Sequence, residues 1–277
     1  MTPNEEQTKL WNGPAGQAWV DAQELLDGMF EPFERMLADE AAGLGARRVL
    51  DVGCGAGGTT LALTRRLGSG ARVEGIDLSE PLIALARQRA SREGLDVAFT
   101  CADAQTHDFP AGAFDLVASR FGVMFFDDFP AAFRNLRRAS ASGAHARLLV
   151  FRSPAENPFM TAAERAAAPL VPDLPPRKPG APGQFALADR ARVESLLGES
   201  GWRDVELRPL DVECRFPAAA LDTYMMRLGP LGLYVSQLDA ATRGRIVSAV
   251  RGAFTEYRRG EHIVFTACCW LVCARAP

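Results

Sequence analysis

The chain has 277 residues, of which 48% are hydrophobic and 23% charged, and its formal net charge is −3. That length and apolar content are enough to bury an α/β core in one domain with an insertion. No basic field or Lys/Arg run is present, so we expect no nucleic-acid partner. The longest apolar run, residues 263–274, is too short to span a bilayer, so we expect no membrane insertion.

The N-terminal residues are polar and lack the apolar region of a signal peptide. The six cysteines show no paired C-x-x-C spacing, and most of them fall in predicted strands. We therefore expect reduced core cysteines, no metal site and a cytoplasmic protein.

The predicted elements begin with a helical segment over residues 8–44, where apolar side chains recur at helical spacing. From residue 47 to about 152, strand and helix patterns alternate, which predicts a parallel sheet with right-handed crossovers. The expected strands lie near 49–52, 71–77, 97–101, 114–119 and 145–152, with helices over 80–92 and 129–139.

The second half of the chain is less regular. Residues 153–183 contain many prolines, which predict a loop over the carboxyl edge of the sheet rather than long helices. A helix is expected over 189–199, and a strand begins near Val205. Residues 217–258 have helical patterns in two pieces, and 263–273 is expected to be the closing strand.

Residues 49–60, VLDVGCGAGGTT, combine an apolar strand, a glycine turn and the start of a helix. This arrangement brings backbone N–H groups close to a nucleotide-like ligand. The glycines fit the dinucleotide pattern G-x-G-x-x-G, and together with Asp51 they also fit D-x-G-x-G-x-G.

Asp51 favours one of these two interpretations. A dinucleotide would place an anionic pyrophosphate near this carboxylate, which would repel it. S-adenosylmethionine carries a sulfonium and an ammonium and has no phosphate. Asp51 therefore favours S-adenosylmethionine as the ligand.

Two more acids are expected at strand ends, Asp77 after the second strand and Asp103 after the third. An acid at the position of Asp77 can hydrogen bond to ribose hydroxyls, a feature that NAD-binding proteins share. A carboxylate at Asp103 can accept a hydrogen bond from the adenine amino group. The fourth strand, 114–119, ends beside the expected transfer site.

With these motifs the chain resembles the class I S-adenosylmethionine-dependent methyltransferases, in particular a small-molecule branch similar to the quinone-biosynthesis methyltransferases. The resemblance rests on VLDVGCGAGG (49–58), EGIDLS (74–79), CADAQ (101–105) and FDLVASRFGVMFF (114–126). TKLWNGPAGQAW (8–19) resembles the N-terminal segment of that branch.

The resemblance implies an α/β fold with a Rossmann-like, doubly wound, seven-stranded sheet whose last strand is antiparallel. N-terminal helices and a helical lid insertion before the last strand complete this fold. The expected parts are an N-terminal helical lid segment (1–45), a cofactor-binding domain (46–211 and 261–277) and a helical substrate cap (212–260).

The resemblance also assigns a cofactor set. Asp77 binds ribose, Asp103 holds the adenine amino group, and the residues that follow each acid flank the ring. The carbonyl of Ser119 meets the methionine ammonium. Trp11 and Trp19 are expected either to cover the cofactor or to anchor the core. The full set is Asp51, Gly53, Cys54, Gly55, Gly57, Asp77, Leu78, Asp103, Ala104, Ser119, Trp11 and Trp19.

The acceptor is expected to lie near the end of the fourth strand and the helical insertion. The candidate contacts are Arg120, Phe121, Met124, Phe125, Tyr224 and Met225, with Met226 and Tyr234 nearby. No catalytic base is assigned. His107 lies just beyond the third-strand motif but is expected on the surface, and His145 and His262 are expected at the starts of strands, which are poor positions for a base.

These features predict an enzyme that transfers a methyl group from S-adenosylmethionine to an O, N or C atom of an apolar or aromatic small molecule, releasing S-adenosylhomocysteine. The expected setting is bacterial secondary metabolism, and catalysis would come mainly from alignment and water exclusion. A nicotinamide-dependent oxidoreductase and a non-catalytic S-adenosylmethionine-binding regulator are the alternatives. Asp51 and the missing Tyr-x-x-x-Lys argue against the oxidoreductase. The sequence gives no oligomeric state.

Overall fold

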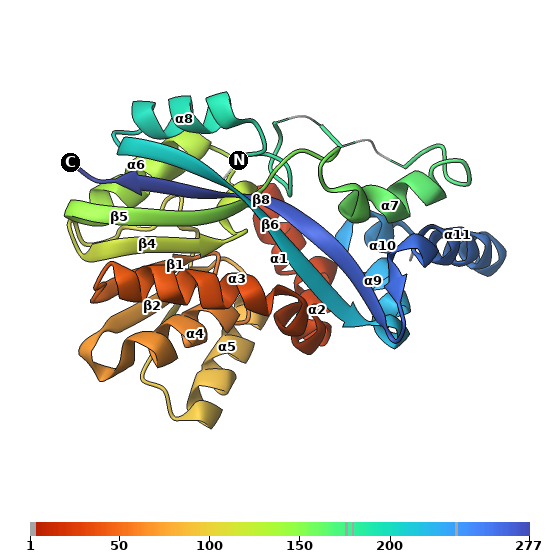
Figure 1. Ribbon diagram of the computed structural model, residues 1–277, viewed down its shortest axis with the longest axis horizontal. Coiled ribbons are helices and arrows are strands. Elements are labelled where there is room, and N and C mark those ends of the chain that lie inside the picture. The colour runs from red at the N-terminus through yellow and green to blue at the C-terminus, as the bar shows by residue number, and fades with distance from the viewer. Residues whose placement is uncertain (1–3, 175–176, 179, 236–237) are drawn as a thin grey trace.

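The computed structural model describes residues 4–174, 177–178, 180–235 and 238–277. A single sheet runs through its centre in the order β3-β2-β1-β4-β5-β8-β6, and the short β7 pairs with β8 (Figure 1). The strands are β1 (Arg48–Val52), β2 (Arg72–Asp77), β3 (Ala98–Cys101), β4 (Phe114–Arg120), β5 (Ser140–Phe151), β6 (Arg203–Pro217), β7 (Arg258–Arg259) and β8 (His262–Arg275).

Strands β1 to β5 pair in parallel, whereas β8 is antiparallel to both β5 and β6. The predicted Rossmann-like sheet with an antiparallel last strand is therefore confirmed. The additional strand, β7, is only two residues long.

Helices cover both faces of the sheet. In Figure 1, α3 (Gln23–Gly43), α4 (Gly58–Leu67) and α5 (Glu80–Glu93) lie on one side, and α6 (Phe129–Ala139) and α8 (Arg190–Glu199) on the other. The Asp128 carboxylate caps α6 by accepting from the Ala131 N–H, and Asp189 caps α8 in the same way. The bounds of α5, α6 and α8 agree closely with the helices predicted over 80–92, 129–139 and 189–199.

The N-terminal segment, predicted as one helical segment over residues 8–44, consists of three helices. It contains α1 (Glu5–Trp11) and α2 (Pro14–Asp21) before α3. Pro14 stands at the first position of α2, where its missing N–H costs nothing, and so it starts a new helix. Trp11 and Trp19 are thus on two helices and not on one helical face, although their rings still touch.

The predicted loop over 153–183 is interrupted by a helix, α7 (Pro158–Ala167). The prediction treated every proline as a breaker, but Pro158 occupies the start of the helix, and no proline follows until after its end. Just before it, the buried Asn157 side chain donates to the Cys268 carbonyl and accepts from the Cys268 N–H, each at 2.9 Å. This bridge fixes α7 to β8. Three prolines of the predicted loop, at 175, 176 and 179, lie outside the described residues.

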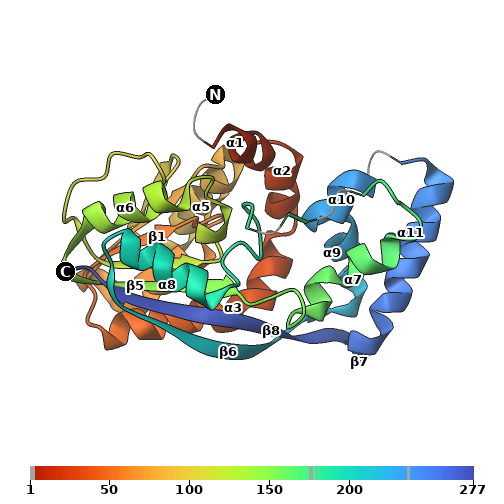
Figure 2. The same cartoon turned by 90° about the horizontal axis from the view of Figure 1, so that it is seen from above.

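Strands β6 and β8 run past the rest of the sheet to a helical group (Figure 2). The group contains α7, α9 (Leu221–Arg227), α10 (Gly229–Val235) and α11 (Ala240–Ala253). The expected helical cap over 212–260 is therefore partly wrong, since residues 212–217 continue β6 and β7 follows α11. Cys214 and Phe216 point inward and Arg215 points outward. This alternation is too short to identify a strand from the sequence without its partner strand β8.

Four 3-10 turns complete the described elements: Gly68–Gly70, Val123–Phe125, Ala218–Ala220 and Thr255–Tyr257. Within the described residues, no helix has both the length and the apolar character needed to cross a bilayer. Cys101 was expected in the core but is exposed, because it ends the edge strand β3.

Candidate functional site

The loop after β1 is built from glycines in left-handed conformations. The φ angles are 67° at Gly53, 54° at Gly55 and 84° at Gly57. A Cβ atom on Gly53 would lie 2.5 Å from the Cα atom of Gly122, which follows β4. The ends of β1 and β4 can therefore approach this closely only because both residues are glycine.

Asp77, at the end of β2, holds the glycine loop in place. Its carboxylate accepts the Gly55 N–H at 2.8 Å and the Ser79 N–H at 2.9 Å. Burial raises the pKa of Asp77, and these backbone hydrogen bonds oppose the rise. One carboxylate thus organises the loops after β1 and β2.

Asp103 follows β3 on the same edge of the sheet. One of its oxygens accepts the Gln105 N–H at 2.9 Å. The other, Oδ2, is buried and has no hydrogen-bond partner among the residues that the structure describes. A buried carboxylate oxygen without a partner is costly, so this atom is suited to a donor group on a ligand.

Asp51 and Ser119 lie behind this edge rather than on it. Asp51 is 1% exposed, and its Oδ2 accepts from the Thr60 hydroxyl at 2.6 Å. Burial raises the pKa of Asp51 to about 6. The Ser119 hydroxyl donates to the Val52 carbonyl at 2.7 Å and so joins β4 to β1. Both side chains support the loop from below.

A cavity of about 930 Å³ runs from these strand ends toward the helical group. Of the expected site residues, four do not line it: Asp51, Gly57, Ser119 and Tyr234. The Met226 side chain lies outside the described part of the chain. The other predicted residues line the cavity, namely Trp11, Trp19, Gly53, Cys54, Gly55, Asp77, Leu78, Asp103, Ala104, Arg120, Phe121, Met124, Phe125, Tyr224 and Met225. The structure thus brings both predicted sets, cofactor and acceptor, to one cavity.

Phe121 forms part of the cavity wall in a strained conformation. Its φ angle of 66° is unfavourable for a bulky residue. Its ring stacks on Phe151 at 4.3 Å and meets Phe30 and Phe33 edge-on. These contacts hold the residue in place and explain how the strain is tolerated.

Buried charges from α3 lie beneath the rim, and the sequence analysis missed them. The Glu34 carboxylate is 3.4 Å from the Arg120 guanidinium, which also donates to the Thr59 hydroxyl at 3.0 Å. Burial raises the pKa of Glu34 to about 7, despite the attraction of Arg120. Phe30 and Leu37, on the buried face of α3, are each one helical turn from Glu34. This spacing was the sequence signal that Glu34 is buried.

The far end of the cavity is lined by apolar side chains that the sequence analysis also missed. Phe159 and Met160 come from α7, Phe185 from the segment before α8, and Phe254 from the end of α11. Phe159 meets the Tyr224 ring at 5.4 Å. Phe159 and Met160 were not predicted because they lie where a loop was expected.

Helix α1 closes the cavity near β2. Trp11 meets Trp19 and Phe125 edge-on, with ring centroids 5.4 and 5.3 Å apart. The Asn12 side chain donates to the Leu78 carbonyl and accepts from the Glu80 N–H, each at 2.9 Å. Asn12 therefore fastens α1 to the loop after β2.

Replacement of Asn12 by alanine removes both of these hydrogen bonds and should loosen α1. At about 1 kcal/mol for each, we expect about 30-fold weaker binding of S-adenosylmethionine by titration calorimetry. Gln17→Ala is the control, because the Gln17 side chain bonds, among the described residues, only to Asp21 within α2. Equal affinities of Asn12→Ala and the unmodified protein would show that α1 does not contribute.

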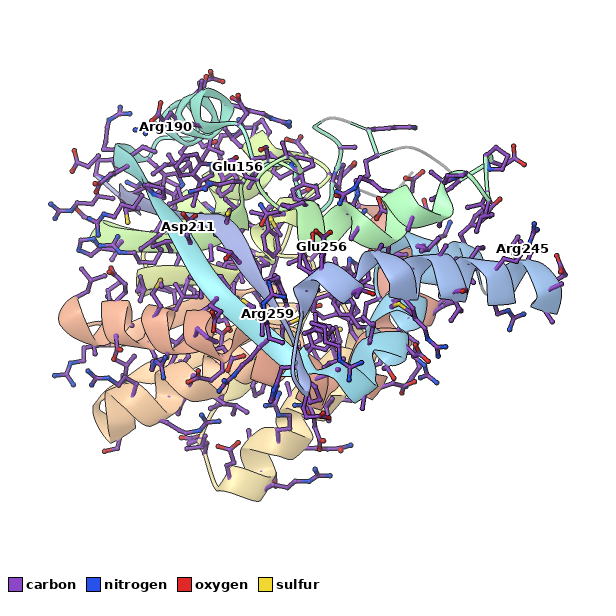
Figure 3. The ribbon with its side chains drawn as sticks, turned by 45° about the vertical axis from the view of Figure 1, so that its right-hand side comes forward. Glu156, Arg190, Asp211, Arg245, Glu256 and Arg259 are labelled. Carbon is purple, nitrogen blue, oxygen red and sulfur yellow. The ribbon has the colours of Figure 1, made fainter. Side chains whose placement is uncertain are left out.

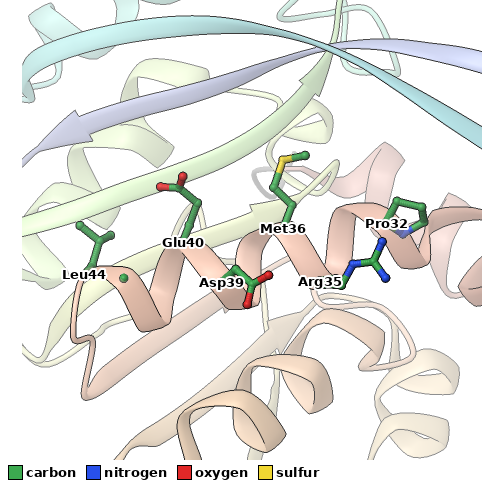
Figure 4. A pocket seen from close by; sticks show the side chains of 7 residues that line it. Pro32, Arg35, Met36, Asp39, Glu40 and Leu44 are labelled. Carbon is green, nitrogen blue, oxygen red and sulfur yellow. The ribbon is translucent and has the colours of Figure 1, made fainter.

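A second hollow, of about 680 Å³, lies along α3 (Figure 4). It is lined by Pro32, Arg35, Met36, Asp39, Glu40, Gly43 and Leu44. These residues all come from one helix, so polar groups from different elements do not converge there. The cavity at the strand ends is the better candidate site.

Residues 49–143 match the protein family described as "Methyltransferase domain". The chain is similar to the demethylmenaquinone methyltransferase of Thermus thermophilus, with 38% identity over 127 residues, which cover 46% of this chain and 57% of that protein. It is also similar to the aklanonic acid methyltransferase DauC of a Streptomyces species, with 36% identity over 126 residues, 45% of this chain and 56% of that protein. The chain spans about half the length of these curated relatives.

Solved structures share the fold at low sequence identity. The YcgJ protein of Bacillus subtilis aligns with a TM-score of 0.56 at 18% identity, covering 83% of this chain and 92% of that one. A structure described as the conversion of a disulfide bond into a thioacetal group during echinomycin biosynthesis aligns with a TM-score of 0.56 at 23% identity, covering 87% and 80%. At these identities the likeness extends to the fold alone.

Proposed function

We propose that this chain, whose residues 49–143 match a methyltransferase domain, is an enzyme of the class I type that transfers a methyl group from S-adenosylmethionine to an apolar or aromatic small molecule. The observation that carries the proposal is one continuous cavity, with the glycine loop, Asp77 and Asp103 at one end and an apolar wall at the other. A cavity of this kind can hold a cofactor and an acceptor side by side.

The residues at the first end fit the cofactor. Asp77 retains acceptor capacity for ribose hydroxyls beyond its two backbone hydrogen bonds. The unpartnered Oδ2 of Asp103 suits the adenine amino group, with Leu78 and Ala104 beside the ring. The glycine loop lets the backbone approach the methionyl part closely.

The side chains of Asp51 and Ser119 support the cofactor site without lining the cavity. The Asp51 carboxylate acts through Thr60 and the loop, as a buried negative charge near the sulfonium end. The Ser119 hydroxyl fixes the distance between β1 and β4, which sets where its carbonyl lies.

When bound, S-adenosylmethionine supplies an electrophilic methyl group for an in-line displacement. The chain's residues would align the acceptor and exclude water, which are the main requirements of such a transfer. Trp11, Trp19 and Phe125 close one side of the cavity, and the stacked rings of Phe121 and Phe151 form part of its wall. We assign no catalytic base, since an amine or phenolate acceptor needs none.

We further propose that the helical group of α7, α9, α10 and α11 is the acceptor cap and that α1 to α3 form the cofactor lid. The names of the two curated relatives, a demethylmenaquinone and an aklanonic acid methyltransferase, support an oxygenated polycyclic acceptor. They also support a biosynthetic setting in bacteria. Figure 3 shows acidic and basic side chains interspersed, among them Glu156, Asp211, Arg190 and Arg259. A mixture of both signs supports a small-molecule partner rather than nucleic acid, which needs a basic field.

Titration calorimetry with S-adenosylmethionine, S-adenosylhomocysteine and NADH tests the proposal. We expect micromolar binding of the first two and no binding of the third. Transfer of a labelled methyl group from the cofactor to an aromatic acceptor would then establish catalysis. Binding of NADH alone would contradict the proposal and favour an oxidoreductase. Cofactor binding without transfer to any acceptor would favour a regulatory protein.

A further inference from the structure

The Tyr224 hydroxyl is a partly buried polar group at the apolar end of the cavity, and its hydrogen-bond partner is a weak acceptor. Its oxygen lies 3.8 Å from the Met160 thioether sulfur, the one hydrogen bond it makes within the described part of the chain. Thioether sulfur is a poor acceptor, whereas a buried hydroxyl strongly favours an oxygen or nitrogen partner. The donor capacity of Tyr224 is therefore largely unused.

The aromatic surroundings fix the direction of the tyrosine. Its ring packs against Phe216 with centroids 5.0 Å apart and against Phe159 at 5.4 Å. Tyr224 belongs to α9, while Phe159 and Phe216 come from α7 and β6. A ring held by three elements presents its hydroxyl at a fixed point of the cavity wall.

Arg177 is another polar residue that lines the cavity, and its guanidinium is already occupied. The Arg177 guanidinium donates to both oxygens of Glu164, at 2.8 and 2.6 Å, and to the Gln184 side chain at 3.0 Å. A ligand that binds Arg177 would have to break its hydrogen bonds to Glu164 and Gln184. Tyr224 can form a new hydrogen bond without breaking a strong one.

Burial raises the pKa of the Tyr224 phenol well above its ordinary value, so the group stays protonated near neutral pH. It acts as a hydrogen-bond donor and does not accept a proton from the acceptor. An oxygen that accepts this hydrogen bond can be a carbonyl, a phenol oxygen or a phenolate.

We propose that Tyr224 selects the acceptor by donating a hydrogen bond to a ring carbonyl or phenolic oxygen, so that the methyl acceptor is an oxygenated, otherwise apolar ring compound. This inference rests on the proposed function, because it takes the apolar end of the cavity as the acceptor site. It makes Tyr224 a specificity-determining residue and assigns it no proton transfer.

A pair of probes that differ by one oxygen tests the inference. 1-Tetralone and tetralin share a bicyclic skeleton, and only the first carries a carbonyl. Their binding to the full chain is measured in the presence of S-adenosylhomocysteine. We expect Tyr224→Phe to weaken 1-tetralone about tenfold and to change tetralin less than about twofold.

Tyr257→Phe is the matched control. Tyr257 also packs on Phe159, with centroids 5.1 Å apart, but it does not line the cavity. We expect this variant to bind both probes as the unmodified protein does. Retained 1-tetralone binding in Tyr224→Phe, or an equal loss in Tyr257→Phe, would overturn the inference.

The test also separates this inference from the proposed function. If neither probe binds although S-adenosylhomocysteine does, the apolar end is not a site for such rings, and the inference fails while the cofactor assignment stands. If S-adenosylhomocysteine does not bind, the proposed function fails. The response of 1-tetralone to Tyr224→Phe then still decides whether the hydroxyl is a recognition group.

Discussion

Replacement of Asp77 by alanine should weaken S-adenosylmethionine binding at least about 100-fold in titration calorimetry. The substitution removes the proposed contacts to the ribose and also the acceptor for the Gly55 and Ser79 N–H groups. Hydrogen bonds to a charged group contribute about 1.5–3 kcal/mol each, so the loss of two accounts for a factor of this size. The loops after β1 and β2 both lose their shared anchor.

Asp115→Ala is a matched control for this experiment. Asp115, at the start of β4, also accepts backbone N–H groups, from Arg47 and Arg48 at 3.0–3.2 Å. It lies at the opposite edge of the sheet and does not line the cavity. We expect this variant to lose stability but to keep its cofactor affinity. Micromolar binding by Asp77→Ala would exclude Asp77 from the cofactor site.

The part of the fold that could be predicted from the sequence is the part with strong local signals. β1 to β5 follow from apolar runs between glycine or acidic turns, and Asp128 and Asp189 mark the starts of α6 and α8. The antiparallel direction of β8 came only from a family resemblance, because strand direction depends on partners distant in sequence. The lengths of β6 and β8 were underestimated for the same reason, β6 by more than β8.

The cofactor end of the site was predictable because its residues follow strand ends in one motif each. Asp77 and Asp103 are brought together by parallel strands whose carboxyl ends share an edge. The acceptor end was not predictable to the same degree. Phe159 lies in the proline-rich segment and Phe185 just after it, and neither position shows periodicity. Packing against distant strands, Phe159 on β6 and Phe185 on β5, places them on the cavity.

The contribution of Asp51 shows how a correct motif can carry an incomplete physical argument. The sequence motif predicts that the Asp51 carboxylate attracts the cationic cofactor. In the structure this side chain is buried below the loop and accepts a hydrogen bond from Thr60. The negative charge can act there only through the loop and over a distance. Sequence spacing gives the end of a strand but not the face to which the side chain points.

Glu34 should make the stability of the protein depend on pH between about pH 4.5 and pH 7. Its pKa rises from an ordinary 4.5 to about 7, because burial disfavours the charged carboxylate more than Arg120 favours it. The folded state therefore binds this proton more tightly than the unfolded state does. The resulting stabilisation is fully present below pH 4.5 and is lost as the pH rises through 7.

Comparison with Glu34→Gln isolates this contribution, because glutamine keeps the shape of the side chain but does not titrate. The free energy of unfolding, measured with urea at several pH values, should fall by about 2 kcal/mol more in the unmodified protein than in the variant from about pH 5 to pH 8. Asp51 has a raised pKa as well, but it titrates in both proteins and cancels in the difference.

Glu31→Gln provides the control on the same helix, since Glu31 is exposed and, within the described chain, pairs only with Arg35 one turn away. Its unfolding free energy should follow that of the unmodified protein within about 0.5 kcal/mol at every pH. Parallel pH profiles for Glu34→Gln and the unmodified protein would mean that Glu34 is solvated in the folded chain. In that case the contact between α3 and Arg120 at the cavity wall would be an ordinary surface ion pair, and α3 would not be coupled to the rim through a buried charge.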